Sequence, residues 1–101
     1  MRSARRAHNA IRTLVEERDD NICVYCGDYA GDLDHILPYS AGGKATPENL
    51  VCCCHKCNMA ASNWIFDSFE DRRRYILLRR FSDPATARSF REMVGAGRLR
   101  C

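Results

Sequence analysis

Four cysteines in this chain of 101 residues have the spacing of metal ligands. Cys23 and Cys26 form one pair with two residues between them, and Cys54 and Cys57 form a second pair further along. Two such pairs are typical of a structural Zn²⁺ ion, which four thiolates surround as a tetrahedron. Because zinc would join two remote segments and add its binding free energy to folding, the sequence predicts a metal-clamped centre.

The second pair leaves a choice of ligand, because Cys52 and Cys53 directly precede Cys54. Only Cys54 leaves a gap of two residues before Cys57. We therefore interpret the other two cysteines as small apolar strand residues. Cys101 has no evident role.

Polar residues suited to phosphodiester hydrolysis lie between the two pairs or directly after the second. Histidine titrates near neutral pH, so His35 could accept a proton from water as a general base. The Asp34 carboxylate and the Asn58 side-chain carbonyl are hard oxygen ligands of the kind that Mg²⁺ and Mn²⁺ prefer. Asn58 follows Cys57 directly, so a zinc site would hold this ligand in position.

Short secondary-structure elements must position these residues. The apolar residues 33–37 and 50–53 predict two strands that could pair as a hairpin. Asp67 with Glu70 forms a capping box that predicts a helix start, and Thr46 is expected to cap one short turn at 46–49. Helices are predicted over residues 3–18, 68–81 and 84–94, and residues 54–62 are expected to form a second cysteine knuckle that runs into a short helix. We interpret residues 1–101 as a single domain, with a motif core at 23–63 and C-terminal helices over about 68–95.

Asp34 and His35 are neighbours, and neighbouring residues of a regular strand point to opposite faces of the sheet. Both side chains could serve one phosphate only if the strand is bent or if the substrate straddles it. The turn that follows, PYSAGG, favours a distorted strand end. We therefore expect the strand to lose its regularity close to His35.

The net charge is only +3, but basic and acidic residues are concentrated in different parts of the chain. Residues 1–18 and 72–101 together hold 14 arginines and 4 acidic residues, whereas residues 19–71 hold 2 lysines and 9 acidic residues. Basic flanks around an acidic middle suit a polyanion that meets metal-binding carboxylates at the centre. Ordinary solvated helix faces would give the same pattern.

The motifs CVYCG, LDHILPYSAGG, PENLV and CHKCN, in this order, resemble the zinc-bearing HNH endonucleases over residues 23–75. The resemblance implies an α+β protein with a ββα-metal (His-Me finger) core, a structural zinc and flanking helices. It also implies DNA hydrolysis to a 5′-phosphate and a 3′-hydroxyl. His35 would be the general base, Asp34 and Asn58 would hold Mg²⁺ or Mn²⁺, and Asn49 would brace the loop behind the histidine.

The sequence departs from the family pattern at two positions. Asn58 stands where many members have histidine, which gives an HNN version of the motif. Ala61 replaces a lysine that members often carry three residues later, so another basic residue would have to contact the phosphate. The candidates for nucleic-acid binding are Lys44, Lys56, Arg72, Arg73 and Arg79.

Two other functions remain open at this point. One is a zinc-stabilised nucleic-acid-binding module without catalysis, and the other is a redox-sensing zinc switch that uses Cys52, Cys53 and Cys101. No signal peptide or membrane-spanning run is evident, so we expect a cytoplasmic protein of a bacterial cell or phage-infected host. We expect a monomer or weak homodimer without membrane contact, which could serve a larger phage or restriction assembly.

Overall fold

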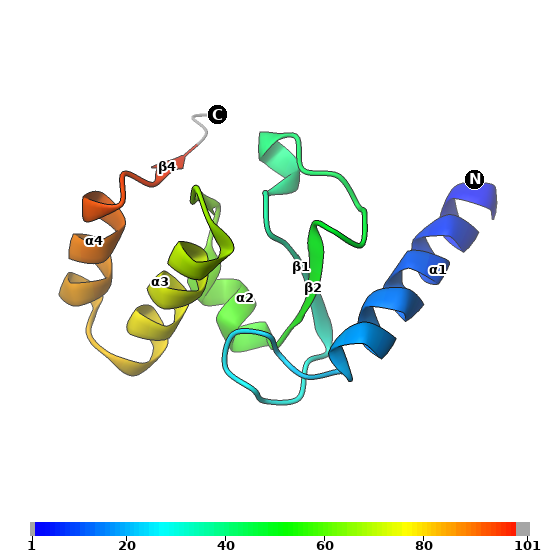
Figure 1. The fold of residues 1–101 in the computed structure, drawn as a ribbon, viewed down its shortest axis with the longest axis horizontal. Coiled ribbons are helices and arrows are strands. Elements are labelled where there is room, and N and C mark those ends of the chain that lie inside the picture. Colours follow the sequence, from blue (N-terminus) through cyan, green and yellow to red (C-terminus); the bar gives the residue numbers. More distant parts are fainter. Residues whose placement is uncertain (1, 99–101) are drawn as a thin grey trace.

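A two-stranded hairpin followed by a short helix stands at the centre of the chain (Figure 1). The computed structural model describes residues 2–98. Its elements, in order, are α1 (Arg2–Asp19), β1 (Asp32–His35), a 3-10 helix (Tyr39–Ala41), β2 (Leu50–Cys53), α2 (His55–Ala61), β3 (Trp64–Ile65), α3 (Phe69–Phe81), α4 (Pro84–Met93) and β4 (Gly97–Arg98). This mixture of helices and short strands confirms the predicted α+β class.

The hairpin pairs β1 with β2 in antiparallel register, with Asp34 opposite Val51 and His35 opposite Leu50. The predicted second strand, residues 50–53, is observed with the same bounds. The first strand ends two residues before the predicted bound, at His35. Beyond this bound, Ile36 N still donates to the backbone carbonyl of Asn49, and Leu37 N then donates to the side-chain oxygen of Asn49.

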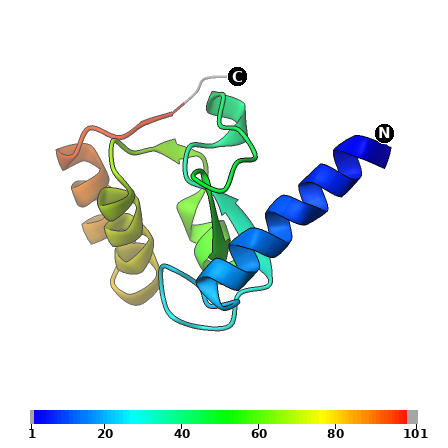
Figure 2. The same cartoon turned by 45° about the vertical axis from the view of Figure 1, so that its right-hand side comes forward.

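All four residues of β2 are buried, which makes this strand the middle of the main core. Helix α1 packs against β2, and α2 packs against α3 (Figure 2). Val15 of α1 and Ile76 of α3 are each fully buried in the same cluster. The small Cys52 and Cys53 side chains fill the space between these elements, as their interpretation as apolar strand residues requires.

A second, smaller cluster lies where α3 meets α4. Tyr75, Ala87 and Phe90 are buried there, and Trp64 of β3 packs against them. Neither β3 nor its antiparallel partner β4 was predicted. Figure 1 shows α4 and α1 at opposite ends of the molecule, with the hairpin between them.

The helix starts follow capping chemistry, with one correction to the prediction. Helix α3 begins after Ser68, whose hydroxyl accepts a hydrogen bond from Asp71 N. The predicted cap, Asp67, lies one residue too early because the shorter hydroxyl of Ser68 already occupies the capping position. Helix α4 begins at Pro84 after Asp83, whose carboxylate accepts from Thr86 N.

The loop between β1 and β2 is held by defined contacts. Asn49 N donates to Thr46 O, which closes the predicted turn at 46–49. Gly43 is buried, and a Cβ atom there would collide with the Leu37 carbonyl and lie 2.9 Å from Asn49 Nδ2. Glycine is required at this position by the close approach of two backbone segments. Among residues 2–98, no helix is both long enough and apolar enough to span a membrane.

Candidate functional site

The four predicted zinc ligands come together in the structure. The sulfur atoms of Cys23, Cys26, Cys54 and Cys57 all lie within 4.8 Å of one another. A Zn–S bond of about 2.3 Å places sulfurs of a tetrahedron about 3.8 Å apart, and Cys26 Sγ lies 3.6 Å from Cys54 Sγ. Burial opposes ionisation of Cys23, but hydrogen bonds from backbone groups, above all that of Cys54, lower its pKa to about 7, whereas burial raises the pKa of Cys26 and Cys57. The four cysteines could therefore hold a zinc ion.

Local structure sets each cysteine pair. In the first pair, Gly27 N donates to Cys23 O, and the positive φ of Gly27 lets the chain turn tightly behind the sulfurs. In the second pair, Cys54 caps α2 and its sulfur accepts from Cys57 N at 3.4 Å. In both pairs, a backbone N–H thus helps to turn the chain around the sulfurs.

Arg80 of α3 reaches the same sulfurs. Its Nη1 atom lies 3.2 Å from Cys57 Sγ and 3.6 Å from Cys54 Sγ. Four thiolates around Zn²⁺ carry a net charge of two negative units, so a guanidinium at this distance offsets part of that charge. Arg80 lies 26 and 23 residues from Cys54 and Cys57 in sequence, so no local pattern predicts this contact.

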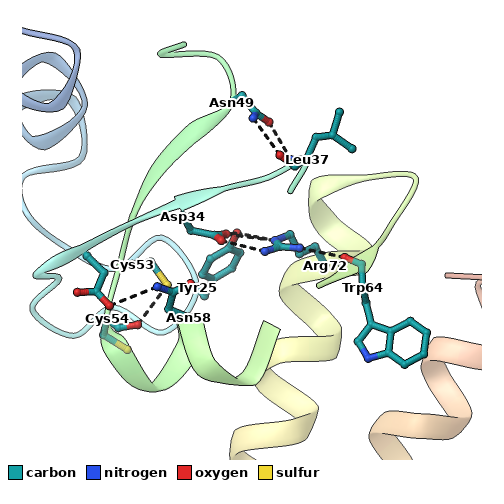
Figure 3. A network of polar contacts seen from close by, with 10 residues as sticks. Tyr25, Asp34, Leu37, Asn49, Cys53, Cys54, Asn58, Trp64 and Arg72 are labelled. Atoms are coloured by element: carbon teal, nitrogen blue, oxygen red, sulfur yellow. Dashed lines mark hydrogen bonds and ion pairs between the residues drawn. The ribbon is translucent and has the colours of Figure 1, made fainter. Parts of the chain in front are cut away.

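Asp34 lies in a buried ion pair with Arg72 (Figure 3). Arg72 Nη2 lies 2.9 Å from Asp34 Oδ1, and Arg72 Nε lies 3.2 Å from Asp34 Oδ2. The hydroxyl of Tyr25 donates to the same Oδ2 atom at 2.5 Å. Asp34 is 5% exposed and Arg72 is 2% exposed, so both charges are compensated inside the core.

These three donors leave room for one more partner on Asp34, because a carboxylate has about four lone-pair positions. The carboxylate oxygens of Asp34 are thus a suitable type of ligand for a divalent ion. However, Arg72 already balances the negative charge that would attract the ion. Burial raises the pKa of Tyr25, so its phenol stays protonated and remains a donor to Asp34.

His35 follows Asp34 at the end of β1 and is half-buried, so water can reach it. Its ring meets the exposed Tyr39 ring edge-on at a centroid distance of 6.3 Å. Within the part of the chain whose side chains are described, no residue hydrogen-bonds the ring nitrogens of His35. These nitrogens are therefore available to accept a proton from water.

Asn58 lies in α2 and faces the start of β1. Its Nδ2 atom lies 3.3 Å from Asp32 Oδ2, and His55 Nδ1 lies 3.2 Å from the same oxygen. Hydrogen bonds from Asn58 and His55 lower the pKa of Asp32 and keep it ionised. Because the amide nitrogen is held by Asp32, the carbonyl oxygen of Asn58 remains available as a metal ligand.

Asn49 fastens the loop that follows His35 (Figure 3). Its side-chain oxygen accepts from Leu37 N at 2.8 Å, and its Nδ2 atom donates to Leu37 O and Lys44 O at 3.1 and 3.0 Å. One amide thus holds the start and the middle of the loop together. This fixes the backbone immediately after the histidine.

The basic residues expected to bind nucleic acid differ in their surroundings. Lys44, Lys56 and Arg79 are exposed, and Arg73 is half-buried. Arg72 differs from that expectation because its guanidinium is buried against Asp34 and donates to the Trp64 carbonyl. Ala61, which replaces a lysine of the family pattern, is fully buried.

Sequence reasoning missed two partners of these residues for different reasons. Asp32 was detectable, since it lies two residues before Asp34 and side chains two apart share a face of a strand. The contact of Tyr25 and Asp34 with Arg72 had no local signal, because Arg72 lies 47 and 38 residues away in sequence.

A family profile and a curated relative both describe endonucleases. The profile of the family described as HNH endonuclease matches residues 23–72, about half of the chain. The CRISPR-associated endonuclease Cas9 of Corynebacterium diphtheriae is 38% identical over 55 residues, a match that covers 50% of this chain and 5% of that relative. The chain thus spans only a small part of the length of this relative. No solved structure matches the chain significantly.

The matched segment begins at the first zinc-site cysteine and ends at the arginine that pairs with Asp34. It contains the hairpin β1–β2 and helix α2, which together form the ββα unit, and all four clustered cysteines. The family profile, the fold and the cysteine cluster agree, and they support nuclease activity in general. This chain belongs to the HNH endonuclease family.

Proposed function

We propose that this protein is a metal-dependent DNA endonuclease that hydrolyses phosphodiester bonds. The observation that carries the proposal is the arrangement of Asp34, His35 and Asn58 on one ββα unit inside the segment that matches the family. The Cas9 relative, whose name describes an endonuclease, adds support. DNA is the substrate that the family implies.

His35 takes the proton from the attacking water at a ring nitrogen, and the water oxygen forms the new bond to phosphorus. The bond between phosphorus and the 3′-oxygen breaks, and that oxygen takes up a proton from solvent. The products carry a 5′-phosphate and a 3′-hydroxyl. Asn49 keeps the backbone after His35 in place while the proton moves.

Asp34 and Asn58 would hold Mg²⁺ or Mn²⁺ through a carboxylate and an amide oxygen. A bound divalent ion supplies charge neutralisation at the phosphate and at the leaving oxygen. Tyr25 and Arg72 orient the Asp34 carboxylate, while Asp32 orients the Asn58 amide. The cysteine cluster, with Zn²⁺ as its ion, positions Asn58 through the neighbouring Cys57.

A plasmid assay tests this function. The purified protein should nick or cut DNA with Mg²⁺ or Mn²⁺, and His35→Ala should stop cleavage while zinc content and circular dichroism persist. His8→Ala is the matched control, since His8 lies in α1 outside the matched segment. Equal cleavage by His35→Ala would refute the role of this imidazole.

A second candidate is a zinc-stabilised nucleic-acid-binding module that does not cut. The ion pair between Asp34 and Arg72 favours it, because a compensated carboxylate attracts a divalent ion less strongly. This module would bind DNA with steep salt dependence and leave plasmid intact under every divalent metal.

A further inference from the structure

A pocket of about 490 Å³ lies between α3, α4 and β3, away from the cysteine cluster. This volume falls in the range of small-molecule sites. Two of its lining residues, Tyr75 and Ala87, are buried. The complete lining consists of Ser62, Trp64, Tyr75, Arg79, Pro84, Ala87, Arg88 and Arg91.

The charge of this lining is uniformly positive. Three arginines contribute to it and no acidic residue does. Among the described side chains, Arg79, Arg88 and Arg91 form no ion pair with a carboxylate. Guanidinium groups that converge without a counter-charge repel one another, and an anion between them removes that cost.

The neighbouring groove on the other side of α3 provides a contrast. Arg73 and Arg74 line it together with Glu70 and the apolar Leu77 and Phe81. An acidic group there offsets part of the positive charge. The uncompensated cluster is therefore confined to the pocket beside Trp64, and it does not extend over all of α3.

Two of the three arginines are held in place by aromatic rings. The Arg91 guanidinium lies 3.7 Å above the centre of the Trp64 ring, and Arg79 Nη1 donates to the Tyr75 hydroxyl at 3.1 Å. Side chains that are already ordered lose less conformational entropy when a ligand binds. The planar fork of arginine also matches the geometry of two phosphate oxygens.

The pocket is connected to the candidate catalytic residues through Trp64. The backbone carbonyl of Trp64 accepts from Arg72 Nη1 at 3.3 Å, and Arg72 holds Asp34 (Figure 3). The same tryptophan therefore carries Arg91 on its ring and Arg72 on its carbonyl. A DNA strand that enters the pocket would therefore contact the protein next to Arg72, the residue that holds Asp34.

We propose that this arginine pocket, defined by Arg79, Arg88, Arg91 and Trp64, binds a backbone phosphate of the DNA strand beside the cleavage site. The choice of DNA rests on the proposed function, whereas the affinity for a phosphate ester rests on the lining alone. The binding is independent of base sequence, because arginines that meet phosphates carry no sequence information.

The single tryptophan of the chain makes the pocket observable, because Trp64 lies in its lining. His35→Ala protein that retains its zinc, in buffer without added Mg²⁺ or Mn²⁺, is titrated with a short oligonucleotide while tryptophan emission and fluorescence anisotropy of the labelled DNA are recorded. These conditions separate binding from cleavage, so a failure of the proposed catalysis leaves the result unaffected. We expect both signals to change with the same midpoint.

Charge-neutralising variants then locate the contact. Arg88→Gln should weaken binding about tenfold and lower the slope of log affinity against log salt by about one. Arg74→Gln is the matched control, since it removes the same charge from the neighbouring groove. Equal losses in both variants, or DNA binding without any change in Trp64 emission, would overturn the proposal.

A mononucleotide distinguishes the two sources of a phosphate ester. At the oligonucleotide concentration that saturates the protein, an equal concentration of mononucleotide should leave Trp64 emission unchanged, because a mononucleotide lacks the contacts that the neighbouring nucleotides of a strand make. Saturation by the mononucleotide with equal affinity would assign the pocket to free nucleotides and refute its role in strand binding.

Discussion

Arg72 holds the carboxylate of Asp34 with two nitrogens, at 2.9 and 3.2 Å, although 38 residues separate the two in sequence. The pair joins α3 to the hairpin strand β1 across the core. Buried pairs of this kind are destabilising to break, because the remaining partner keeps an uncompensated charge.

Replacing Arg72 with methionine should lower the free energy of unfolding by about 3–5 kcal/mol, because Asp34 stays buried without its counter-charge. Urea unfolding followed by circular dichroism measures the change. The double variant Arg72→Met with Asp34→Asn should recover part of the loss. A fall of the same size in Arg73→Met, on the partly exposed neighbour, would show that the effect is not specific to the ion pair.

The same variant probes the proposed metal ligand. If Asp34 binds a divalent ion, Mn²⁺ should raise the melting temperature of Arg72→Met more than that of the unchanged protein, because the ion replaces the missing positive charge. Differential scanning fluorimetry with and without Mn²⁺ provides the comparison. No extra stabilisation of Arg72→Met by Mn²⁺ would remove Asp34 from the proposed ligands.

Tyr25 should ionise only at high pH. Burial raises its pKa in the folded state, and the charge of Asp34 raises it further. Since the unfolded pKa is about 10, the protonated phenol contributes stability that is complete below that pH and is lost as pH rises through the folded value. An ultraviolet titration should therefore find one of the four tyrosines ionising only as the protein unfolds.

Two phenylalanine variants assign this late step. Tyr25→Phe should remove it, whereas Tyr39→Phe, at a residue that is 80% exposed, should leave it in place. A late step that survives in Tyr25→Phe would show that another tyrosine is responsible.

Arg80 should strengthen zinc binding, because its guanidinium lies against the sulfurs of Cys54 and Cys57. Outer partners of metal ligands change metal affinity by about 10–100-fold when removed. We expect Arg80→Ala to lose zinc to a colorimetric chelator at about tenfold lower chelator concentration. Arg79→Ala is the control, since Arg79 contacts Tyr75 and no cysteine. An unchanged zinc affinity in Arg80→Ala would contradict the prediction.

The cysteine cluster and most elements could be predicted because their signals are local. Two residues between cysteines define a metal pair, and Asp83 followed by Pro84 defines the start of α4. The strand at 50–53 was found from its apolar composition alone. Each of these signals lies within a few residues of the structure that it specifies.

The surroundings of Asp34 could not be predicted in this way. Asp34 was interpreted as a metal ligand, and the structure shows that it is 5% exposed and lies against Tyr25 and Arg72. Only the packing of α3 against α2 brings Arg72 to the hairpin. Similarly, the pairing of β3 with β4 depends on residues that are more than 30 positions apart.

Gly43 is constrained by a contact far from any charged group. A methyl group at this position would strike the Leu37 carbonyl and displace the Asn49 amide, which together anchor the chain just beyond His35. A Gly43→Ala change would therefore alter the position of the His35 imidazole indirectly, by weakening the Asn49–Leu37 contacts that hold the backbone after it. The position of His35 thus depends on the absence of a side chain at Gly43, a residue of the following loop.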